Sequence, residues 1–141
     1  MVKPTLLYRI ASVLLVVFAA GHTFGFLKFK PPTPEGLGVW EGMNNVHFQI
    51  GKSTYTYESF YNGFGLFATL YLLFAAFLAW HLGNVARNQP QAIGALGWVF
   101  FALQIGSIVL SWVYFLAPPV ILSALVAVCT GWAAWLVSAG A

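Results

Sequence analysis

The sequence predicts an all-α fold, an antiparallel four-helix transmembrane bundle with a long lid-like loop between its first two helices. The 141 residues are 60% hydrophobic and only 6% charged, whereas a soluble domain carries about 25% charged residues. Four mainly apolar stretches also reach the roughly 20 residues that a helix needs to cross the hydrocarbon core of a bilayer. These stretches cover residues 5–27, 60–82, 92–116 and 118–137.

The first stretch has some features of a cleaved signal peptide, because Lys3 and Arg9 precede an apolar run that contains Ala19 and Ala20. Phe18, however, occupies the position where a cleavage site needs a small residue, and the apolar run continues beyond it. We therefore expect a retained helix. Four helices joined mostly by short links predict a single transmembrane domain over residues 1–141.

Charged residues give a balanced topology signal. With four alternating spans, three cations fall on each side of the membrane, so the positive-inside comparison is a tie. All three acidic residues fall on the side of the long loop, and the first helix usually dominates orientation. We therefore expect both termini in the cytoplasm. The cations are Lys3, Arg9 and Arg87 on one side and Lys28, Lys30 and Lys52 on the other.

The long loop, residues 28–56, carries its own structural signals. Thr33 followed by Pro34 is typical of a helix start. Apolar residues then recur at helical spacing, which predicts a short amphipathic helix lying on the membrane surface or over the mouth of the bundle. These residues are Val39, Met43, Val46 and Ile50. Residues 51–53 read as a turn before the second span.

Polar side chains inside the spans are the informative residues for function, because a polar group facing lipid costs several kcal/mol. They fall at helical steps and, with alternating helices, most lie in the half of the membrane beneath the long loop. We expect them to face inward and to bound a polar pocket, with two loop residues above it. The expected ligand-binding residues are Asn62, Gln104, Ser111, Tyr114, Glu41 and His47, beside His22 and Glu58.

His22 and Glu58 are the candidate catalytic residues. An ionisable group within a span is a functional hypothesis, and a histidine and a glutamate within hydrogen-bond reach could serve as acid and base. The alternative for His22 is a bond to a neighbouring helix that holds the bundle together. The alternative for Glu58 is capping at a helix start, where a carboxylate is favoured by the dipole.

Several function classes lack their signatures. The net charge of +3 is small and scattered, which argues against nucleic acid as a partner. The chain has no aspartate and no closely spaced pair of histidines, so no metal site is expected. Phosphate-binding loops and serine nucleophile motifs are also missing. No cofactor is identified, and the sequence leaves open whether the protein is an enzyme.

Two hypotheses therefore remain. In the first, the pocket binds or acts on a small lipid-like molecule, such as an isoprenoid or a quinone-like compound, because aromatic walls around a few polar groups are how small-molecule sites are usually built. In the second, the protein is a structural or assembly subunit of a membrane complex and has no ligand. The bilayer is its partner in both, and a homo-oligomer or a partner subunit is compatible with both.

Two stretches carry a resemblance: Gly21 to Phe26 (GHTFGF) and Tyr57 to Leu66 (YESFYNGFGL), with Val46 to Phe48 (VHF) between them. Together they resemble small four-helix bacterial integral membrane proteins of unassigned function. The resemblance covers about the first half of the chain. It implies a multi-pass protein of the bacterial inner membrane and brings no reaction or substrate with it.

Overall fold

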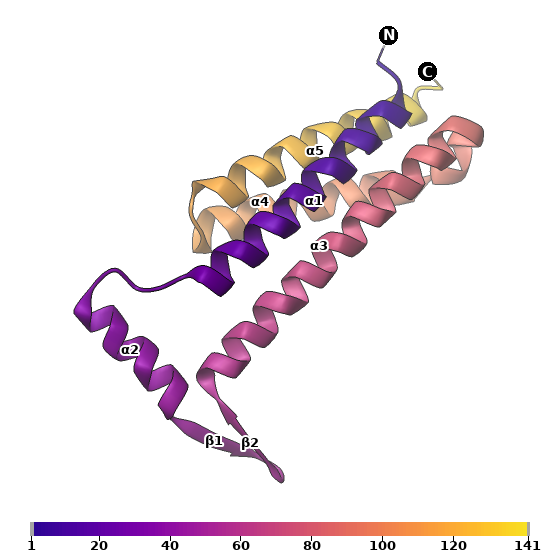
Figure 1. Cartoon of the computed structure of the whole chain (residues 1–141). Helices are drawn as coiled ribbons and strands as arrows, with labels where there is room; N and C mark the ends of the chain where they lie inside the picture. The colour runs from indigo at the N-terminus through magenta and orange to yellow at the C-terminus, as the bar shows by residue number, and fades with distance from the viewer. Residues whose placement is uncertain (1, 141) are drawn as a thin grey trace. The chain divides into compact units, whose positions relative to one another are not determined.

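The computed structural model describes residues 2–140 and confirms the all-α class (Figure 1). Over these residues the chain forms five α-helices, one short 3-10 helix and a two-stranded hairpin. In chain order they are α1 (Pro4–Lys28), α2 (Pro34–Asn45), β1 (His47–Ile50), β2 (Ser53–Thr56), α3 (Tyr57–Asn88), η1 (Pro90–Ile93), α4 (Ala95–Tyr114) and α5 (Ala117–Ser138).

Four of the helices, α1, α3, α4 and α5, are long and apolar enough to cross a membrane. Most of their large apolar side chains are exposed rather than packed inside the protein. In water this surface would be strongly unfavourable, whereas hydrocarbon tails cover it without cost. The chain is therefore a multi-pass membrane protein.

The second predicted span, residues 60–82, lies within helix α3. This helix extends beyond the prediction at both ends, from Tyr57 to Asn88. At its start, Thr56 and Ser59 exchange hydrogen bonds between backbone and side chain, which caps the first turn. At its end, residues 83–88, which lie beyond the predicted span, continue the helix. Helices α4 and α5 lie within two or three residues of the predicted limits.

The loop helix is confirmed, with a correction to its extent. Thr33 caps α2, because its Oγ1 accepts a hydrogen bond from the backbone N–H of Gly36 at 3.1 Å. Val46, however, lies just after the helix, and Ile50 belongs to β1. The predicted turn is present, with Gly51 at φ 63°, and it joins two antiparallel strands that the sequence analysis missed. The role of residues 28–56 as a lid stays a prediction.

The chain divides into two compact units, and the division falls within α1 and α3. The first unit, called here the core unit, comprises residues 1–18 and 72–141. The second, called here the loop unit, comprises residues 19–71.

The core unit contains the buried apolar cluster, including Tyr8, Leu15 and Val126. Its part of α1 packs against its part of α3, where the buried Ser12 donates a hydrogen bond to the Ala76 carbonyl at 2.7 Å. Helices α4 and α5 run in opposite directions, because Trp98 bonds to Ser138 and Phe101 lies against Gly131. Small residues allow this approach, since a Cβ at Gly131 would come within 2.8 Å of the Phe101 ring.

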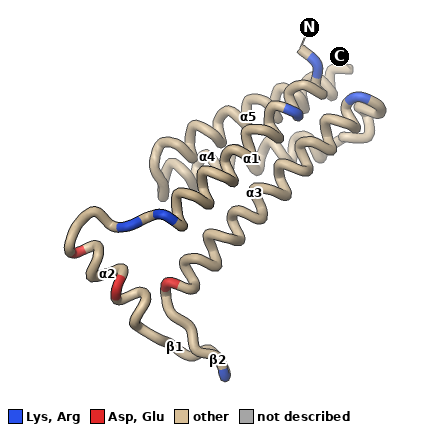
Figure 2. Tube along the Cα trace, viewed as in Figure 1, with Lys and Arg blue, Asp and Glu red and all other residues tan. Residues whose placement is uncertain are grey.

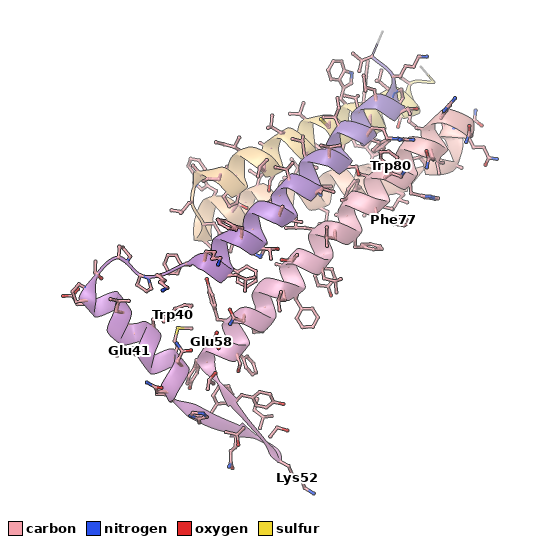
Figure 3. All side chains as sticks on the ribbon, in the orientation of Figure 1. Trp40, Glu41, Lys52, Glu58, Phe77 and Trp80 are labelled. Atoms are coloured by element: carbon pink, nitrogen blue, oxygen red, sulfur yellow. The ribbon has the colours of Figure 1, made fainter. Side chains whose placement is uncertain are left out.

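The loop unit contains the end of α1, α2, the hairpin and the first half of α3. Its hairpin carries an aromatic cluster in which the Phe48 ring lies 4.8 Å from Tyr57 and 5.3 Å from Phe60, measured between ring centroids. Lys52 occupies the tip of the hairpin (Figure 3). No residue of α2 is fully buried.

Candidate functional site

The end of α1 and the start of α3 face each other inside the loop unit through polar contacts. His22 Nε2 lies 3.1 Å from the Gly65 carbonyl oxygen. The hydroxyl oxygen of the next residue, Thr23, lies 2.7 Å from that of Thr69, one turn beyond Gly65 on α3. Both pairs join residues that are distant in sequence, and all four residues are partly buried. Gly65 and Thr69 of α3 therefore face α1 within the loop unit.

The protons of the two threonines can be assigned. Each hydroxyl has one proton to donate, but three contacts compete for the two protons: Thr23 to the Ala19 carbonyl at 2.7 Å, Thr69 to the Gly65 carbonyl at 3.2 Å, and the Thr23–Thr69 contact. The two short contacts are satisfied if Thr23 donates to Ala19 and Thr69 donates to Thr23. The Gly65 carbonyl then accepts mainly from His22.

The contact with the Gly65 carbonyl fixes the tautomer of a neutral His22. A carbonyl oxygen can only accept, so His22 Nε2 must carry the proton that it donates to Gly65. The other ring nitrogen, Nδ1, makes no hydrogen bond with residues 2–140, so its lone pair can accept a proton or a hydrogen bond. His22 thus combines a structural bond on one nitrogen with a nitrogen that remains available for a ligand.

A continuous series of aromatic contacts extends from His22 to α2. The His22 ring lies 5.2 Å from Phe26, Phe26 lies 6.3 Å from Tyr61, and Tyr61 lies 5.8 Å from Trp40, all measured between centroids. Figure 3 shows Trp40 on the side of α2 that faces α3. These rings give the polar group of His22 an apolar, polarisable border, the usual composition of a small-molecule site.

Glu58 has a partner other than His22. Its carboxylate accepts a hydrogen bond from the Asn62 side-chain amide, one turn further along α3. Within residues 2–140 the structure gives no hydrogen bond between Glu58 and His22, and each is bonded elsewhere. Tyr61 and Asn62 stand three and four residues after Glu58, and Gly65 stands four and three residues after them. The carboxylate and the aromatic series therefore share one face of α3. The acid–base pairing of His22 with Glu58 stays a prediction.

The two candidate residues of the loop segment are exposed. Glu41 lies on α2, and His47 opens β1. The His47 Nδ1 atom lies 2.8 Å from the carbonyl of Asn45 and must donate to it, so its ring is tied to its own backbone. Figure 3 shows Glu41 on α2.

Gln104, Ser111 and Tyr114 belong to the core unit and lie on α4. Gln104 and Ser111 are buried, with exposed fractions of 4% and 6%. Tyr114 does not follow the expected inward orientation, since 73% of it is exposed. The difference has a simple cause: Tyr114 is the last residue of α4, where a tyrosine suits the membrane interface.

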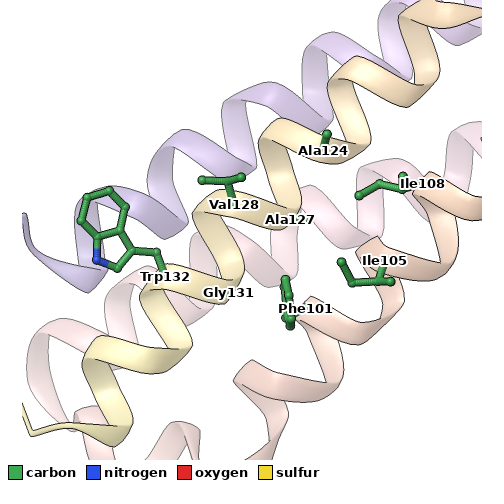
Figure 4. Close-up of a pocket in the computed structure, with 8 residues that line it drawn as sticks. All are labelled: Phe101, Ile105, Ile108, Ala124, Ala127, Val128, Gly131 and Trp132. Carbon is green, nitrogen blue, oxygen red and sulfur yellow. The ribbon is translucent and has the colours of Figure 1, made fainter.

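A separate groove lies between α4 and α5 in the core unit (Figure 4), with a volume of about 420 Å³. Its walls include Phe101, Ile105, Val128 and Trp132. The lining is apolar and offers no convergent polar groups that could orient a substrate.

Sequence reasoning missed Phe26 and Trp40 as members of the site. Phe26 could have been found, because it follows His22 by one helical turn and so lies on the same face of α1. Trp40 could not, because its approach to Tyr61 depends on how α2 folds back toward α3.

Among residues 2–140, no three side chains of histidine, cysteine, aspartate or glutamate gather closely enough to hold a metal ion.

Comparisons of the chain with protein families, curated proteins and solved structures found no match. The architecture and the site thus define a multi-pass membrane protein with a polar and aromatic seam between α1 and α3.

Proposed function

We propose that the loop unit binds a small, largely apolar molecule with one polar end, such as a lipid, an isoprenoid or a quinone-like compound. The observation that carries this proposal is the free Nδ1 of His22 at the end of a continuous aromatic series. A polar head group would donate a hydrogen bond to His22 Nδ1, and the apolar remainder would contact Phe26, Tyr61 and Trp40.

The chemistry of such a site follows from its groups. A neutral imidazole with a free Nδ1 accepts a proton from a hydroxyl, and the Gly65 carbonyl stabilises the resulting cation by accepting from Nε2. Glu58, held by Asn62, supplies a carboxylate on the same face of α3. Any catalysis would therefore be proton transfer by His22, with Glu58 as the second group.

Native mass spectrometry of the protein purified with membrane lipid extract tests the proposal. Wild type should retain a small molecule, and His22→Gln should lose it, because the glutamine amide cannot reproduce the aromatic ring or its acceptor nitrogen. His81→Gln is the matched control, since His81 lies in the core unit and its replacement should leave binding unchanged. Retention of no molecule by wild type would refute the proposal.

The second candidate function is a structural or assembly subunit without a ligand. The observation that favours it is that His22, Thr23 and Thr69 all make bonds between helices. Under this hypothesis, His22→Gln and Glu58→Gln should both lower the melting temperature, and no molecule should co-purify with wild type. Under the ligand hypothesis, at least one of these variants should stay as stable as wild type while binding is lost.

We also propose that the four apolar helices form an antiparallel bundle in a bacterial inner membrane, with both termini in the cytoplasm. The resemblance to small bacterial membrane proteins supports the location, and the acidic residues of the loop segment support the orientation.

A further inference from the structure

A second polar arrangement lies in the core unit, around Arg9. This arginine is in the second turn of α1, where its guanidinium carbon lies 3.5 Å above the centroid of the Trp80 ring. Its Nη2 donates a hydrogen bond to Asn84 Oδ1 at 2.7 Å. A stacked and hydrogen-bonded guanidinium is held in one orientation, unlike a free surface arginine.

No aspartate or glutamate side chain lies in the same unit as Arg9. All three acidic residues of the chain, Glu35, Glu41 and Glu58, belong to the loop unit. The core unit instead carries Lys3, Arg9 and Arg87, near the start of α1 and the end of α3 (Figure 2). The helix dipoles do not change this balance, because the start of one helix and the end of the other contribute about +0.5 and −0.5 charge.

The hydrogen-bonding capacity of Arg9 is also largely unused. A guanidinium has five N–H donors, and only the bond to Asn84 is made with the residues that the structure describes. Nε is buried without an acceptor among these residues, and it lies beside α3, since a Cβ at Gly83 would be 3.4 Å from it. The side chain as a whole stays partly exposed, so the remaining terminal N–H groups can meet a ligand.

Arg9 and Asn84 lie near the ends of two helices that are long and apolar enough to cross a membrane. Arg9 is about 7.5 Å along α1 from Pro4, and Asn84 is about 6 Å from the end of α3, at 1.5 Å rise per residue. Helical side chains tilt toward the N-terminus of their own helix, so the long Arg9 side chain points toward the membrane surface. Trp80 is half exposed beside it, as is typical of an interfacial tryptophan.

From these observations we propose that Arg9, positioned by Trp80 and Asn84, binds the phosphate of an anionic membrane lipid. Planar guanidinium groups suit phosphate oxygens because two parallel N–H groups can donate together. Lys3 and Arg87 add attraction without fixed geometry. This site lies in the core unit and is independent of the ligand proposed for the loop unit.

The test uses the purified, delipidated protein and two probes, phosphatidylglycerol and phosphatidylcholine, counted as bound lipids by native mass spectrometry. Wild type should prefer phosphatidylglycerol, and Arg9→Gln should weaken its binding by about tenfold. Arg87→Gln is the matched control, because it removes the same charge from the same unit without touching Trp80 or Asn84. It should weaken binding by less than about threefold.

Arg9→Lys is a second variant, which keeps the proposal testable if Arg9→Gln misfolds. Lysine keeps the charge but loses the planar fork, so binding should fall several-fold while the melting temperature stays near that of wild type. Equal losses in Arg9→Gln and Arg87→Gln would overturn the proposal in favour of unspecific charge attraction. Absence of any preference for phosphatidylglycerol in wild type would also overturn it. If millimolar inorganic phosphate displaces the lipid, the site binds free phosphate rather than a lipid head group, and the proposal of a lipid ligand is wrong.

Discussion

Thr23 of α1 and Thr69 of α3 join their helices through a hydrogen bond of 2.7 Å between their hydroxyl oxygens. Because Thr23 also donates to the Ala19 carbonyl, Thr69 is the donor in the pair. Beside this pair, His22 Nε2 donates to the Gly65 carbonyl, which leaves Nδ1 without a hydrogen bond to residues 2–140. The two contacts together join the end of α1 to the first half of α3 within the loop unit.

The first prediction concerns the tautomers of two histidines. His22 should carry its proton on Nε2, because Nε2 donates to Gly65, whereas His47 should carry it on Nδ1, because Nδ1 donates to Asn45. Solid-state NMR with ¹⁵N-labelled histidine measures this directly, at a pH about two units above the usual histidine pKa of about 6.5. His22→Gln and His47→Gln assign the signals. Identical tautomers at the two positions would contradict the proton assignment.

The second prediction concerns the threonine pair. Thr69→Val keeps the side-chain shape but removes the bond to Thr23, so it should lower the free energy of unfolding by about 0.5–1.5 kcal/mol. Thr130→Val is the control, because Thr130 donates only to carbonyls of its own helix, those of Val126 and Ala127. Denaturation in mixed micelles compares the two. A larger loss in Thr130→Val would show that the link between α1 and α3 is unimportant.

The third prediction concerns packing of α4 against α5. Gly131→Ala places a Cβ 2.8 Å from the Phe101 ring, so the ring must move, at a cost of about 1–3 kcal/mol. Gly106→Ala meets nothing within 4 Å, and it should leave stability unchanged or raise it, since alanine favours helices. Melting temperatures of the two variants check this. If Gly106→Ala is the more damaging change, the described contact between α4 and α5 is incorrect.

The fourth prediction concerns a buried hydroxyl. Tyr8 is completely buried, and its hydroxyl has no hydrogen-bond partner among residues 2–140. Tyr8→Phe should therefore preserve or increase the melting temperature, because it removes a polar atom that makes no bond there. Ser12→Ala, which removes the buried bond to the Ala76 carbonyl, should instead decrease it. The opposite order would mean that the Tyr8 hydroxyl has a partner.

The fifth prediction concerns topology. With both termini in the cytoplasm, a membrane-impermeant thiol reagent added outside should label Lys52→Cys but not Asn88→Cys. Cys129 is the only native cysteine and is replaced by serine in both variants. Labelling of Asn88→Cys alone would reverse the orientation.

The spans could be predicted from sequence because length and apolar composition decide them. The extension of α3 to Asn88 could not, because Asn84 and Arg87 are polar and look like loop residues, while in the structure Asn84 bonds to Arg9. The hairpin was missed because the apolar spacing of Val46 and Ile50 after Met43 fits a helix as well. In the structure, Gly51 has a positive φ that forms the turn, and Phe48 pairs with Tyr55, so these residues form two antiparallel strands instead.

The candidate site was predictable only in its residue types. Helical spacing indicates that Glu58, Asn62 and Gly65 share a face of α3, and the structure agrees. Spacing cannot show which group another helix presents, so the backbone carbonyl of Gly65 could not be foreseen as the partner of His22. Spacing alone can also mislead: Gly21 and Gly25 stand four residues apart, as in close helix contacts, yet a Cβ at either position would meet nothing within 4 Å.

Photo-crosslinking with a diazirine-bearing isoprenyl quinone, followed by peptide mapping, tests the central proposal most directly. Adducts should concentrate on the end of α1, on α2 and on the start of α3, near His22, Trp40 and Tyr61. Unlabelled quinone and His22→Gln should both suppress them. Adducts spread evenly over the lipid-exposed faces of α4 and α5, and unaffected by either treatment, would contradict the proposal.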